Sequence, residues 1–493
     1  MTISTPYLIL PFRFIRVTGS EVLLVNEAGE FLFLNPDTFE DFINYRLDTG
    51  SECFLNLKGK HFATDTEIAP VIDLLSTKYR TKKGFLRNFT TLHMIVITLR
   101  CNHKCRYCQA SSEPPENMQW DMSPAVARKV VDIIFQTPSP SVKIEFQGGE
   151  PLLNLEAVKE IVEYAKLINK RSQKGLELVI CTNLTLIDEE TLQFLKKHNI
   201  LISTTLDGPK YLHDRNRILR NGGSSYDLVI KNLQLAQEIL GKDRVSALMT
   251  ASKDSLYHLR DVVDEYVNRG FRGIFLRAIN PFGYAKWNYQ LVGYNIEKFI
   301  ESYKDVLKYI IELNLKGIYF EEFYTSLILS KILTPFHTGF MDFQSPSGAG
   351  ICGAIYDYNG DVYPCDEGRM LAKMGNKRFL MGNVNEGNFK DIFGGEVLKE
   401  ITQKSCVEIL PGCAECAFQQ YCGADPIRNY SEQGDIFGHR PTSEFCKKHT
   451  GIIKFLFDLI HDNDQDTMDV FWSWITKRPL ERIRCAEFPR EAC

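Results

Sequence analysis

The feature that most constrains the fold is an alternation of apolar strands with amphipathic helices, repeated six times after about residue 92. The six strands are predicted at 92–99, 142–149, 176–183, 200–208, 245–252 and 273–280. Apolar runs of this kind are typical of parallel strands that are buried on both faces. The alternation predicts an α/β fold, either an open barrel or a doubly wound sheet, with its chemistry at the carboxyl ends of the strands.

Motifs that can carry chemistry stand at these carboxyl ends. Cys101, Cys105 and Cys108 follow the first strand, in the stretch TLRCNHKCRYCQ. Gly-Gly-Glu-Pro follows the second strand, Thr-Asn ends the third, and Leu-Asp-Gly ends the fourth. Because the carboxyl ends of parallel strands meet at one edge of a sheet, these motifs are expected to form one site.

The chain divides into four predicted parts. Residues 1–85 combine two strands around a Glu-Ala-Gly-Glu turn with helical segments, which indicates a small α+β module. Residues 86–340 hold the six strand–helix units. Residues 341–449 are rich in Gly and Cys, with too few apolar residues for a large core, and metal sites commonly hold such segments together. Residues 450–493 are predicted to be a helical pair.

Composition excludes several functional classes. The 493 residues carry a net charge of −4, which gives no basic surface for nucleic acid. The sequence shows no signal peptide and no apolar run long enough to span a membrane, so a cytoplasmic protein with neither nucleic acid nor membrane as partner is expected. Fourteen cysteines without a secretion signal argue against a disulfide framework. Their clustering favours metal, whereas Cys53, Cys181, Cys485 and Cys493 are scattered and are interpreted as buried small side chains or incidental thiols.

The three clustered cysteines at 101–108 are soft ligands suited to zinc or to an iron–sulfur cluster. A Cys-x3-Cys-x2-Cys loop can wrap three corners of a cubane and leave the fourth iron free for another molecule. The alternatives are a zinc knuckle completed by His103, or three unconnected thiols.

With Tyr107 between the last two cysteines, the loop resembles the Cys-x3-Cys-x-aromatic-Cys signature of the radical S-adenosylmethionine (SAM) superfamily. Gly148, Gly149, Glu150 and Pro151 are similar to the glycine-rich motif of that family, and the resemblance covers about residues 92–320. It implies a partial (β/α)6 barrel with a [4Fe–4S] cluster on the three cysteines. It also implies that Tyr107 lies against the adenine and that Glu150 and backbone carbonyls bind the methionine ammonium.

Further SAM contacts are implied by the later strand ends. CTNLTL resembles the family's Thr-Asn-Gly motif, with Leu184 in place of Gly, and makes Asn183 a candidate for a contact to the nucleoside. TTLDGPKYLHDRNR resembles a stretch of peptide-modifying members, in which Thr205 is a hydroxyl near SAM and Arg217 is a carboxylate partner. The alternatives are a tight turn at 207–208 and a solvated helix charge at Arg217.

A second group of cysteines resembles the SPASM extension of radical SAM peptide maturases, which holds auxiliary iron–sulfur clusters. The resemblance implies six metal ligands: Cys352, Cys365, Cys413, Cys416, Cys422 and Cys446. The last four are expected to bind one complete cluster. A zinc ribbon is the alternative for this region.

The sequence departs from the SPASM pattern at Pro426, where a cysteine is expected. The nearer auxiliary cluster therefore has only Cys352 and Cys365 as cysteine ligands. Asp425 or Cys406 completes it, or a ligand position is open for substrate, or the cluster is absent. One or two auxiliary clusters are therefore expected.

Asp366 follows Cys365 directly, as does the proposed general base of sulfatase-maturing relatives. A carboxylate that lies beside a cluster and away from water has a perturbed proton affinity, which suits proton removal coupled to oxidation. The alternative is an exposed acid or a hydrogen-bond acceptor.

The stretches LPFRF…EVLLVNEAGEFLFL, TLRCNHKCRYCQ and YCGADP…QGD…GHRPTSEFC together resemble the His-Xaa-Ser system radical SAM maturase family, over nearly the whole chain. The resemblance implies an oxidoreductase in which reduction of the cluster cleaves SAM to a 5′-deoxyadenosyl radical. This radical takes a hydrogen atom from a ribosomally made precursor peptide. Expected partners are that peptide, an electron donor such as flavodoxin or ferredoxin, and a partner maturase, and the N-terminal module is a candidate leader-peptide recognition domain or a structural cap. The alternatives are formylglycine formation on a sulfatase and a non-catalytic cluster-binding scaffold.

Overall fold

The computed structural model describes residues 5–17 and 21–484, so that Cys485 and Cys493 lie outside the described residues. Within these ranges no helix is long and apolar enough to cross a membrane.

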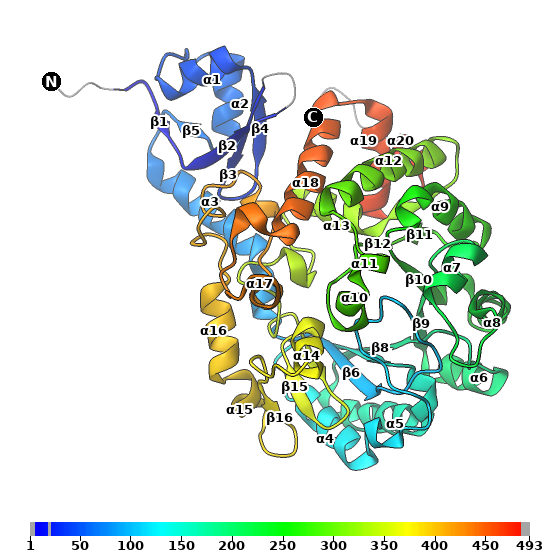
Figure 1. Cartoon of the computed structure of the whole chain (residues 1–493). Coiled ribbons are helices and arrows are strands. Elements are labelled where there is room, and N and C mark those ends of the chain that lie inside the picture. The colour runs from blue at the N-terminus through cyan, green and yellow to red at the C-terminus, as the bar shows by residue number, and fades with distance from the viewer. Residues whose placement is uncertain (1–4, 18–20, 485–493) are drawn as a thin grey trace.

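The centre of the molecule is a curved sheet built from the six predicted strands (Figure 1). They are β6 (Leu92–Thr98), β7 (Ser141–Gly148), β8 (Gly175–Cys181), β9 (Ile200–Thr205), β10 (Val245–Thr250) and β12 (Leu276–Arg277). Each pairs in parallel with the next in sequence order. The sixth predicted strand is divided, because β11 (Gly273–Ile274) pairs instead with β13 (Glu321–Glu322). The predicted partial barrel is confirmed.

Six helices alternate with these strands and cover the outer face of the sheet (Figure 1). They are α4 (Pro124–Ile134), α5 (Leu155–Ser172), α6 (Glu189–His198), α8 (Ser225–Leu240), α9 (Leu259–Asn268) and α12 (Ile296–Leu315). The predicted start of α4 is confirmed, since the Ser123 side chain accepts a hydrogen bond from the Val126 amide and Pro124 stands in the first turn.

The two faces of β7 differ in polarity. Val142, Ile144 and Phe146 are buried in the main hydrophobic core. The alternate residues Glu145 and Gln147 point to the opposite face, because successive side chains of a strand alternate in direction. The concave face of the sheet is therefore partly polar and lines a cavity.

The Cys-rich segment extends this sheet. β14 (Gly353–Tyr356) pairs in parallel with β6, and β15 (Asp361–Tyr363) and β16 (Gly382–Asn383) follow in antiparallel order. The result is one nine-stranded sheet. His93 of β6 lies 3.1 Å from the Tyr356 hydroxyl of β14, through Nδ1. Residues 341–449 therefore share the sheet and core of the barrel.

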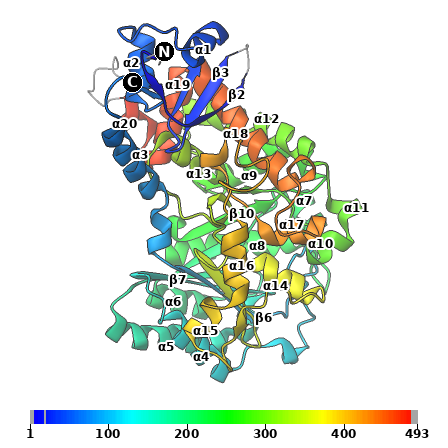
Figure 2. The same cartoon turned by 90° about the vertical axis from the view of Figure 1, so that its left-hand side faces the viewer.

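Further helices follow outside this alternation and outside the N-terminal module. They are α7 (Lys210–Asn216), α10 (Gly283–Trp287), α11 (Tyr289–Val292), α13 (Phe323–Leu333), α14 (Asp366–Lys373), α15 (Phe389–Phe393), α16 (Glu396–Lys404), α17 (Pro426–Gln433), α18 (Glu444–Asp462), α19 (Gln465–Thr476) and α20 (Leu480–Arg484). The Cys-rich segment (yellow to orange) runs between the N-terminal module and helices α4 and α5 in Figure 2. The predicted boundary between residues 449 and 450 falls inside α18, so it does not separate two folding units.

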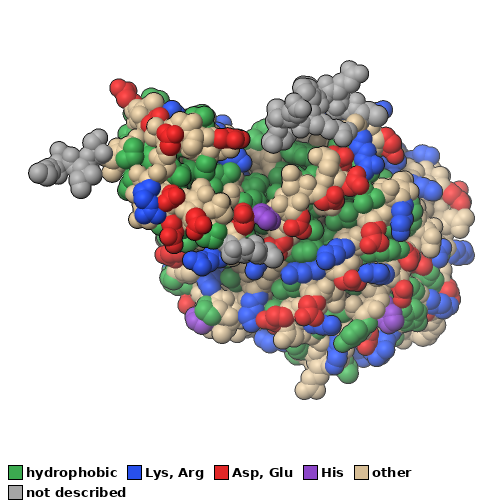
Figure 3. All heavy atoms as spheres, turned by 90° about the horizontal axis from the view of Figure 1, so that it is seen from above, with side chains coloured by type: hydrophobic (Ala, Val, Ile, Leu, Met, Phe, Trp, Pro, Cys, Tyr) green, Lys and Arg blue, Asp and Glu red, His purple; other side chains and the backbone are tan. Residues whose placement is uncertain are grey.

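The N-terminal module has a hydrophobic core of its own that includes Phe42, Phe54 and Phe62. Its sheet has the order β2 (Phe12–Arg16), β3 (Val22–Asn26), β4 (Phe31–Leu34), and β1 (Leu8–Ile9) pairs with β5 (Ala63–Thr64). Its helices are α1 (Pro36–Ile43), α2 (Glu52–Gly59) and α3 (Ile68–Lys82). The module protrudes beside the C-terminal helices, and charges of both signs are interspersed over the face seen in Figure 3.

Candidate active site

The backbone of the Gly-Gly-Glu segment after β7 packs against the residues that lead into the cysteine loop. The Gly149 amide donates to the Thr98 carbonyl at 2.8 Å, and the Glu150 amide donates to the Arg100 carbonyl at 2.7 Å. A Cβ on Gly148 would lie 2.0 Å from the Thr98 oxygen, and a Cβ on Gly149 would lie 2.2 Å from the Arg100 oxygen. These glycines are therefore required by the approach of two protein backbones, in addition to any contact with a ligand.

The stretch after α7 fastens the cysteine loop from the other side. The Lys104 amide donates to the Ile218 carbonyl at 2.7 Å, and the Arg106 amide donates to the Asn216 carbonyl at 2.9 Å. Arg220 Nε donates to the Cys101 carbonyl at 3.0 Å. The loop is thus held by main-chain hydrogen bonds at its start and in its middle and by the Arg220 side chain, which restricts the positions of its thiols.

A cavity of about 270 Å³ gathers most of the predicted SAM-binding residues. Its lining includes Cys101, Cys105, Tyr107, Cys108, Gly148, Gly149, Asn183, Thr205 and Arg217. Glu150 and Pro151 do not line it. The sequence therefore predicted one site from four separate strand ends, and the structure brings these residues together.

Glu150 is fully buried behind the cavity, and its carboxylate is engaged inside the protein. Oε1 accepts hydrogen bonds from Thr182 Oγ1 at 2.7 Å and the Leu152 amide at 3.1 Å, and Oε2 accepts from the Asn183 amide at 2.7 Å. Burial raises its pKa, and these donors oppose the shift. Glu150 thus positions Asn183 at the end of β8, and its predicted contact with the methionine ammonium stays a prediction.

A buried network joins three side chains at the opposite wall. The Tyr107 hydroxyl donates to Asp207 Oδ2 at 2.5 Å, and Arg217 Nη1 donates to the Tyr107 oxygen at 3.2 Å. Arg217 is only 9% exposed, which excludes the alternative of a solvated helix charge. Burial raises the pKa of Asp207, and the Arg217 guanidinium opposes this shift. The sequence indicated only a turn at Asp207, which is in fact the charge partner of this network.

Asn183 connects the third strand end to the cysteine loop. Its Nδ2 donates to Asn102 Oδ1 at 2.9 Å and lies 3.9 Å from Cys101 Sγ. Leu184, which replaces the family's glycine, has a φ of +63°. The left-handed backbone turn of the motif is therefore kept without the glycine, and the buried Leu184 side chain offsets the strain.

The three thiols form a charge cluster that requires compensation. Burial, then Cys105, Glu150 and Cys108 raise the pKa of Cys101 well above its ordinary value. Burial raises the pKa of Cys105 to about 11, although the Arg217 guanidinium opposes this. The thiols become ligands when a metal centre supplies positive charge and displaces their protons.

The arrangement fits a cluster better than a single ion. Among the described residues, no three His, Cys, Asp or Glu side chains are placed to hold one metal ion. Thiolates of a cubane bind different irons and therefore stand further apart than ligands of one zinc. His103 Nε2 lies 3.3 Å from Thr185 Oγ1, and His103 does not line the cavity. The zinc knuckle with His103 is not supported.

A second set of thiols has the composition of an auxiliary cluster site. Burial, then Cys446, Cys416 and Cys413 raise the pKa of Cys422, so the four thiols are close enough to interact. Cys446 stands in the first turn of α18, where the helix dipole favours a thiolate. These residues fit the four-cysteine ligand set of one cluster.

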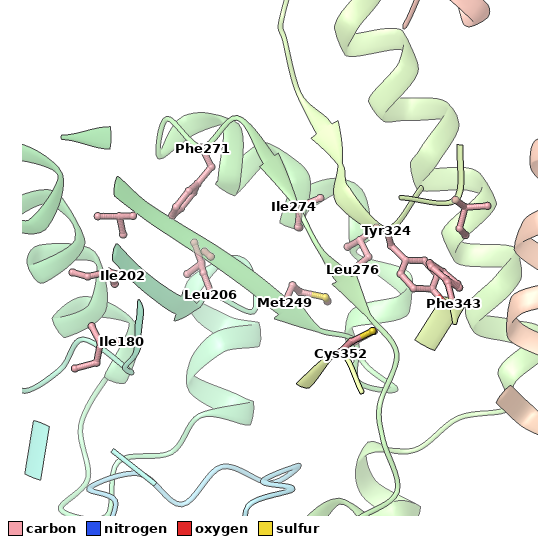
Figure 4. Close-up of a cluster of buried hydrophobic side chains, with 14 of the residues drawn as sticks. Ile180, Ile202, Leu206, Met249, Phe271, Ile274, Leu276, Tyr324, Phe343 and Cys352 are labelled. Atoms are coloured by element: carbon pink, nitrogen blue, oxygen red, sulfur yellow. The ribbon is translucent and has the colours of Figure 1, made fainter. Parts of the chain in front are cut away.

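Cys352 and Cys365 do not complete a further ligand set. Cys352 borders the main core (Figure 4), whereas Cys365 packs in another cluster with residues such as Met370. Burial alone raises the pKa of Cys352, and no thiol is among the main causes of the shift at Cys365. Asp425 is near Cys365, but it also caps α17 by accepting from the Arg428 amide at 2.9 Å. The residues present do not fit a second auxiliary cluster.

Cys406 is the other residue considered for this ligand set. Its thiol donates to the Thr402 carbonyl at 3.5 Å and lies beside Glu408 and Lys83. The Cys406 thiol therefore lies in a different environment, and it does not complete a ligand set with Cys352 and Cys365.

A second cavity, of about 310 Å³, adjoins the first one. Five residues line both cavities: Glu145, Gln147, Leu248, Arg277 and Asp366. Burial and Glu367 raise the pKa of Asp366 to about 6, and the guanidinium groups of Arg369 and Arg277 oppose this. Asp366 therefore stands where the two cavities meet, with a pKa suited to accepting a proton near neutral pH.

Cys181, Glu145 and Arg277, at or beside this junction, are among the residues that were not identified from the sequence. Cys181 donates its thiol hydrogen to Glu145 Oε1 at 3.2 Å and lines the first cavity, although it was interpreted as a buried small side chain or an incidental thiol. Glu145 lies at an alternate position of a strand that was predicted to be apolar on both faces. The charged or polar residues within predicted strands, including Arg277 at the end of the sixth, were the signal that these side chains line a cavity.

Two family sequence models match this chain. Residues 95–265 match the radical SAM superfamily, and residues 352–417 match SPASM, an iron-sulfur cluster-binding domain. The first match spans the cysteine loop and the strands around the first cavity.

Curated relatives include enzymes with related chemistry. The cysteine-type anaerobic sulfatase-maturating enzyme of Clostridium perfringens is 24% identical over 371 residues, which cover 72% of this chain and 93% of that enzyme. The radical SAM cyclopropyl synthase TigE of Paramaledivibacter caminithermalis is 25% identical over 301 residues, which cover 57% of this chain and 58% of TigE.

Solved structures share the fold. Native anSMEcpe with bound AdoMet has a TM-score of 0.62 and 20% identity, covering 75% of this chain and 98% of its own. Streptococcus suis SuiB bound to its precursor peptide SuiA has a TM-score of 0.53 and 15% identity, covering 90% of this chain and 99% of its own. Together with the family matches, the two thiol sets identify this chain as a radical SAM enzyme with a SPASM iron–sulfur domain, which uses SAM and a [4Fe–4S] cluster.

Proposed function

We propose that this enzyme modifies a ribosomally made peptide after translation. The observation that carries the proposal is the junction of the two cavities at Arg277 and Asp366. The first cavity is lined by most of the predicted SAM-binding residues, and the second provides room for a substrate residue next to them. The solved neighbour SuiB is bound to a precursor peptide, which supports the same class of substrate.

The bound cofactors supply a 5′-deoxyadenosyl radical, which takes a hydrogen atom from the substrate. The protein's own residues determine the geometry of this step. Cys101, Cys105 and Cys108 hold the cluster, while Asn183 and Arg217 orient SAM against the first cavity. The buried walls of both cavities exclude water, which protects a reactive intermediate from side reactions.

Asp366 is proposed as the group that accepts a proton from the substrate. It lies at the junction of the cavities, and the guanidinium of Arg277, which also lines both cavities, opposes the rise of its pKa. A carboxylate at this place can remove a proton from a substrate carbon, nitrogen or sulfur once hydrogen-atom abstraction has made that proton more acidic. Cys413, Cys416, Cys422 and Cys446 would hold an auxiliary cluster, which would supply an acceptor for the remaining electron.

The proposal is tested with anaerobically reconstituted enzyme, SAM and a strong reductant. Wild type is expected to form 5′-deoxyadenosine, and Cys105→Ala is expected to form none above background. Co-expression with a candidate precursor peptide is expected to produce a mass change that depends on Cys105. Absence of 5′-deoxyadenosine from wild type would overturn the mechanism.

Formylglycine formation on a sulfatase is the second candidate function. Asp366 follows Cys365 as the proposed base does in sulfatase-maturing relatives, and the curated relatives include four sulfatase-maturating enzymes, three of them of the cysteine type. A cysteine-containing sulfatase peptide distinguishes the two functions, since only a sulfatase maturase converts its cysteine to formylglycine.

The finer assignment to the His-Xaa-Ser maturase family stays a proposal. It implies a partner maturase and an electron donor such as flavodoxin or ferredoxin. Residues 1–85 are proposed to bind the leader segment of the peptide by adding it as a strand. Deletion of a leader segment should then weaken binding without changing SAM cleavage in the absence of peptide.

A further inference from the structure

The second cavity contains polar atoms that have no partner inside the protein. Asn280 is 8% exposed and Tyr324 is 4% exposed, and both line the cavity. Asn280 Oδ1 and the Tyr324 hydroxyl lack hydrogen-bond partners among the described residues. Asn280 Nδ2 donates to Glu367 Oε1 at 2.8 Å, which fixes the amide orientation, because a carboxylate can only accept. A buried amide oxygen without a donor is costly, so a ligand that donates a hydrogen bond is expected here.

The charges around the cavity favour a positive ligand. The carboxylates in the lining are Glu145, Asp342, Asp366, Glu367 and Asp425, and the cations are Arg277, Arg428 and Lys448. Arg428 Nε donates to Glu432 Oε1 at 2.6 Å, outside the lining, so its charge is already paired. Burial raises the pKa of Asp425 to about 8, so near neutral pH the other four carboxylates face two available cations.

The side chain of Asp342 is a carboxylate of this lining without a hydrogen-bond or ion-pair partner among the described residues. Burial raises its pKa, and Lys448 and Arg277 oppose this without reaching ion-pair distance. A cation bound beside Asp342 would restore the solvation that burial removes.

The apolar wall gives the cavity the character of a side-chain pocket. Leu276, Tyr324 and Cys352 line the cavity, and Figure 4 shows these three side chains near one another. Aliphatic and aromatic walls with a few polar groups at defined places are typical of pockets that take one side chain. The methylene or ring part of a basic side chain would pack on these walls while its charged group reaches the carboxylates.

We propose that this cavity binds a cationic side chain of the peptide substrate, such as a protonated amine, a guanidinium or an imidazolium. The proposal rests on the peptide-modifying function proposed above and specifies its substrate class. Binding of that side chain places the neighbouring peptide atoms at the junction with the SAM cavity, beside Asp366. The specificity residues are Asp342 and Asn280, with Tyr324 as a further hydrogen-bonding group.

The test is direct binding of capped tripeptides, acetyl-Gly-Xaa-Gly-amide, to the reconstituted holoenzyme with SAM and without reductant. Peptides with Lys, Arg or His at the centre, the last below neutral pH, are compared with peptides that carry Glu or Leu. At least one basic peptide is expected to bind, and the Glu and Leu peptides are expected to bind at least about tenfold more weakly. Equal binding of the Glu peptide, or no saturable binding of any basic peptide at millimolar concentration, would overturn the proposal.

Two variants connect this binding to the cavity. Asp342→Asn keeps the shape of the side chain and removes its charge, so the affinity for the basic peptide is expected to fall roughly tenfold. Asp435→Asn, at an exposed position, is the matched control and should leave the affinity unchanged. An Asp342→Asn enzyme that binds the basic peptide as wild type does would also contradict the proposal. Because binding is measured without turnover, failure of radical formation in the separate 5′-deoxyadenosine assay cannot be mistaken for failure of this pocket.

Discussion

The hydroxyl of Tyr107 donates a 2.5 Å hydrogen bond to Oδ2 of Asp207, which joins the cysteine loop to the residues after β9. Arg217 Nη1 donates to the same hydroxyl at 3.2 Å. Among the described residues Arg217 Nε has no partner, and Arg217 lines the first cavity, where SAM is proposed to bind. Tyr107 and Asp207 therefore hold a guanidinium group with a free donor at this cavity.

Tyr107→Phe is expected to weaken SAM binding. The variant removes the hydroxyl that orients Arg217, at a cost of about 1.4 kcal/mol, or about a tenfold higher Kd for SAM. Iron content should not change, since the thiols are unaffected. Equilibrium binding of SAM to the anaerobic enzyme measures the effect. Tyr211→Phe is the matched control, because its hydroxyl also donates to a carboxylate, Asp261, at an exposed site; an equal effect in both variants would argue against the orienting role.

The stability of the junction between β6 and β14 is expected to depend on pH through His93. Burial lowers the pKa of His93 to about 3, below its ordinary value of 6.5. Between these values the unfolded chain binds a proton that the folded chain does not. The free energy of unfolding therefore falls as the pH decreases below about 6.5, by up to about 1.4 kcal/mol per pH unit from this group.

His93→Phe should reduce this slope, because it removes the titrating group and keeps most of its volume. Urea unfolding of the anaerobic protein at several pH values between 4.5 and 7 (about two and a half units) measures it. Tyr356→Phe is the control, since it removes the 3.1 Å contact to His93 and leaves the buried imidazole in place. An unchanged slope in His93→Phe would assign the pH dependence to other buried groups.

The cluster content is expected to be two per chain. The cysteine loop and the set around Cys422 each have the ligands of a [4Fe–4S] cluster, which gives about eight irons. Cys416→Ala should lose about four irons, whereas Cys352→Ala should lose none, because Cys352 has no thiol partner. Iron and sulfide analysis with Mössbauer spectroscopy provides the count. About twelve irons in wild type, or loss of iron in Cys352→Ala, would contradict this prediction and show that a second auxiliary cluster is present.

The fold of the barrel followed from local patterns. The six strands and the capping of α4 by Ser123 depend on alternation and on local hydrogen bonds, which a sequence displays directly. The pairing of β14 with β6 was not predicted, because β14 is only four residues long and its partner is about 260 residues away in sequence. Sequence patterns report the local structure of such a short strand poorly and its partner not at all.

The location of the site could be predicted from the sequence, but the directions in which its side chains point could not. The motifs at four strand ends meet at one cavity because parallel strands share an edge. The side chain of Glu150, however, turns to Thr182 and Asn183 and away from the cavity, since a buried carboxylate requires several donors. Which neighbour satisfies a buried polar group depends on packing in three dimensions, and this is also why the sequence indicated no more than a turn at Asp207.

Asp366→Asn is expected to separate radical formation from product formation. Asp366 lines both cavities, and its carboxylate has no hydrogen-bond or ion-pair partner among the described residues, so its replacement by the isosteric amide should not disturb the fold. SAM cleavage to 5′-deoxyadenosine should continue, while the peptide modification should fall by about a hundredfold or more, the usual contribution of a general base. Both products are measured in the same reaction by mass spectrometry. Loss of both products together would indicate a role in SAM binding, and retention of both would show that another group accepts the proton.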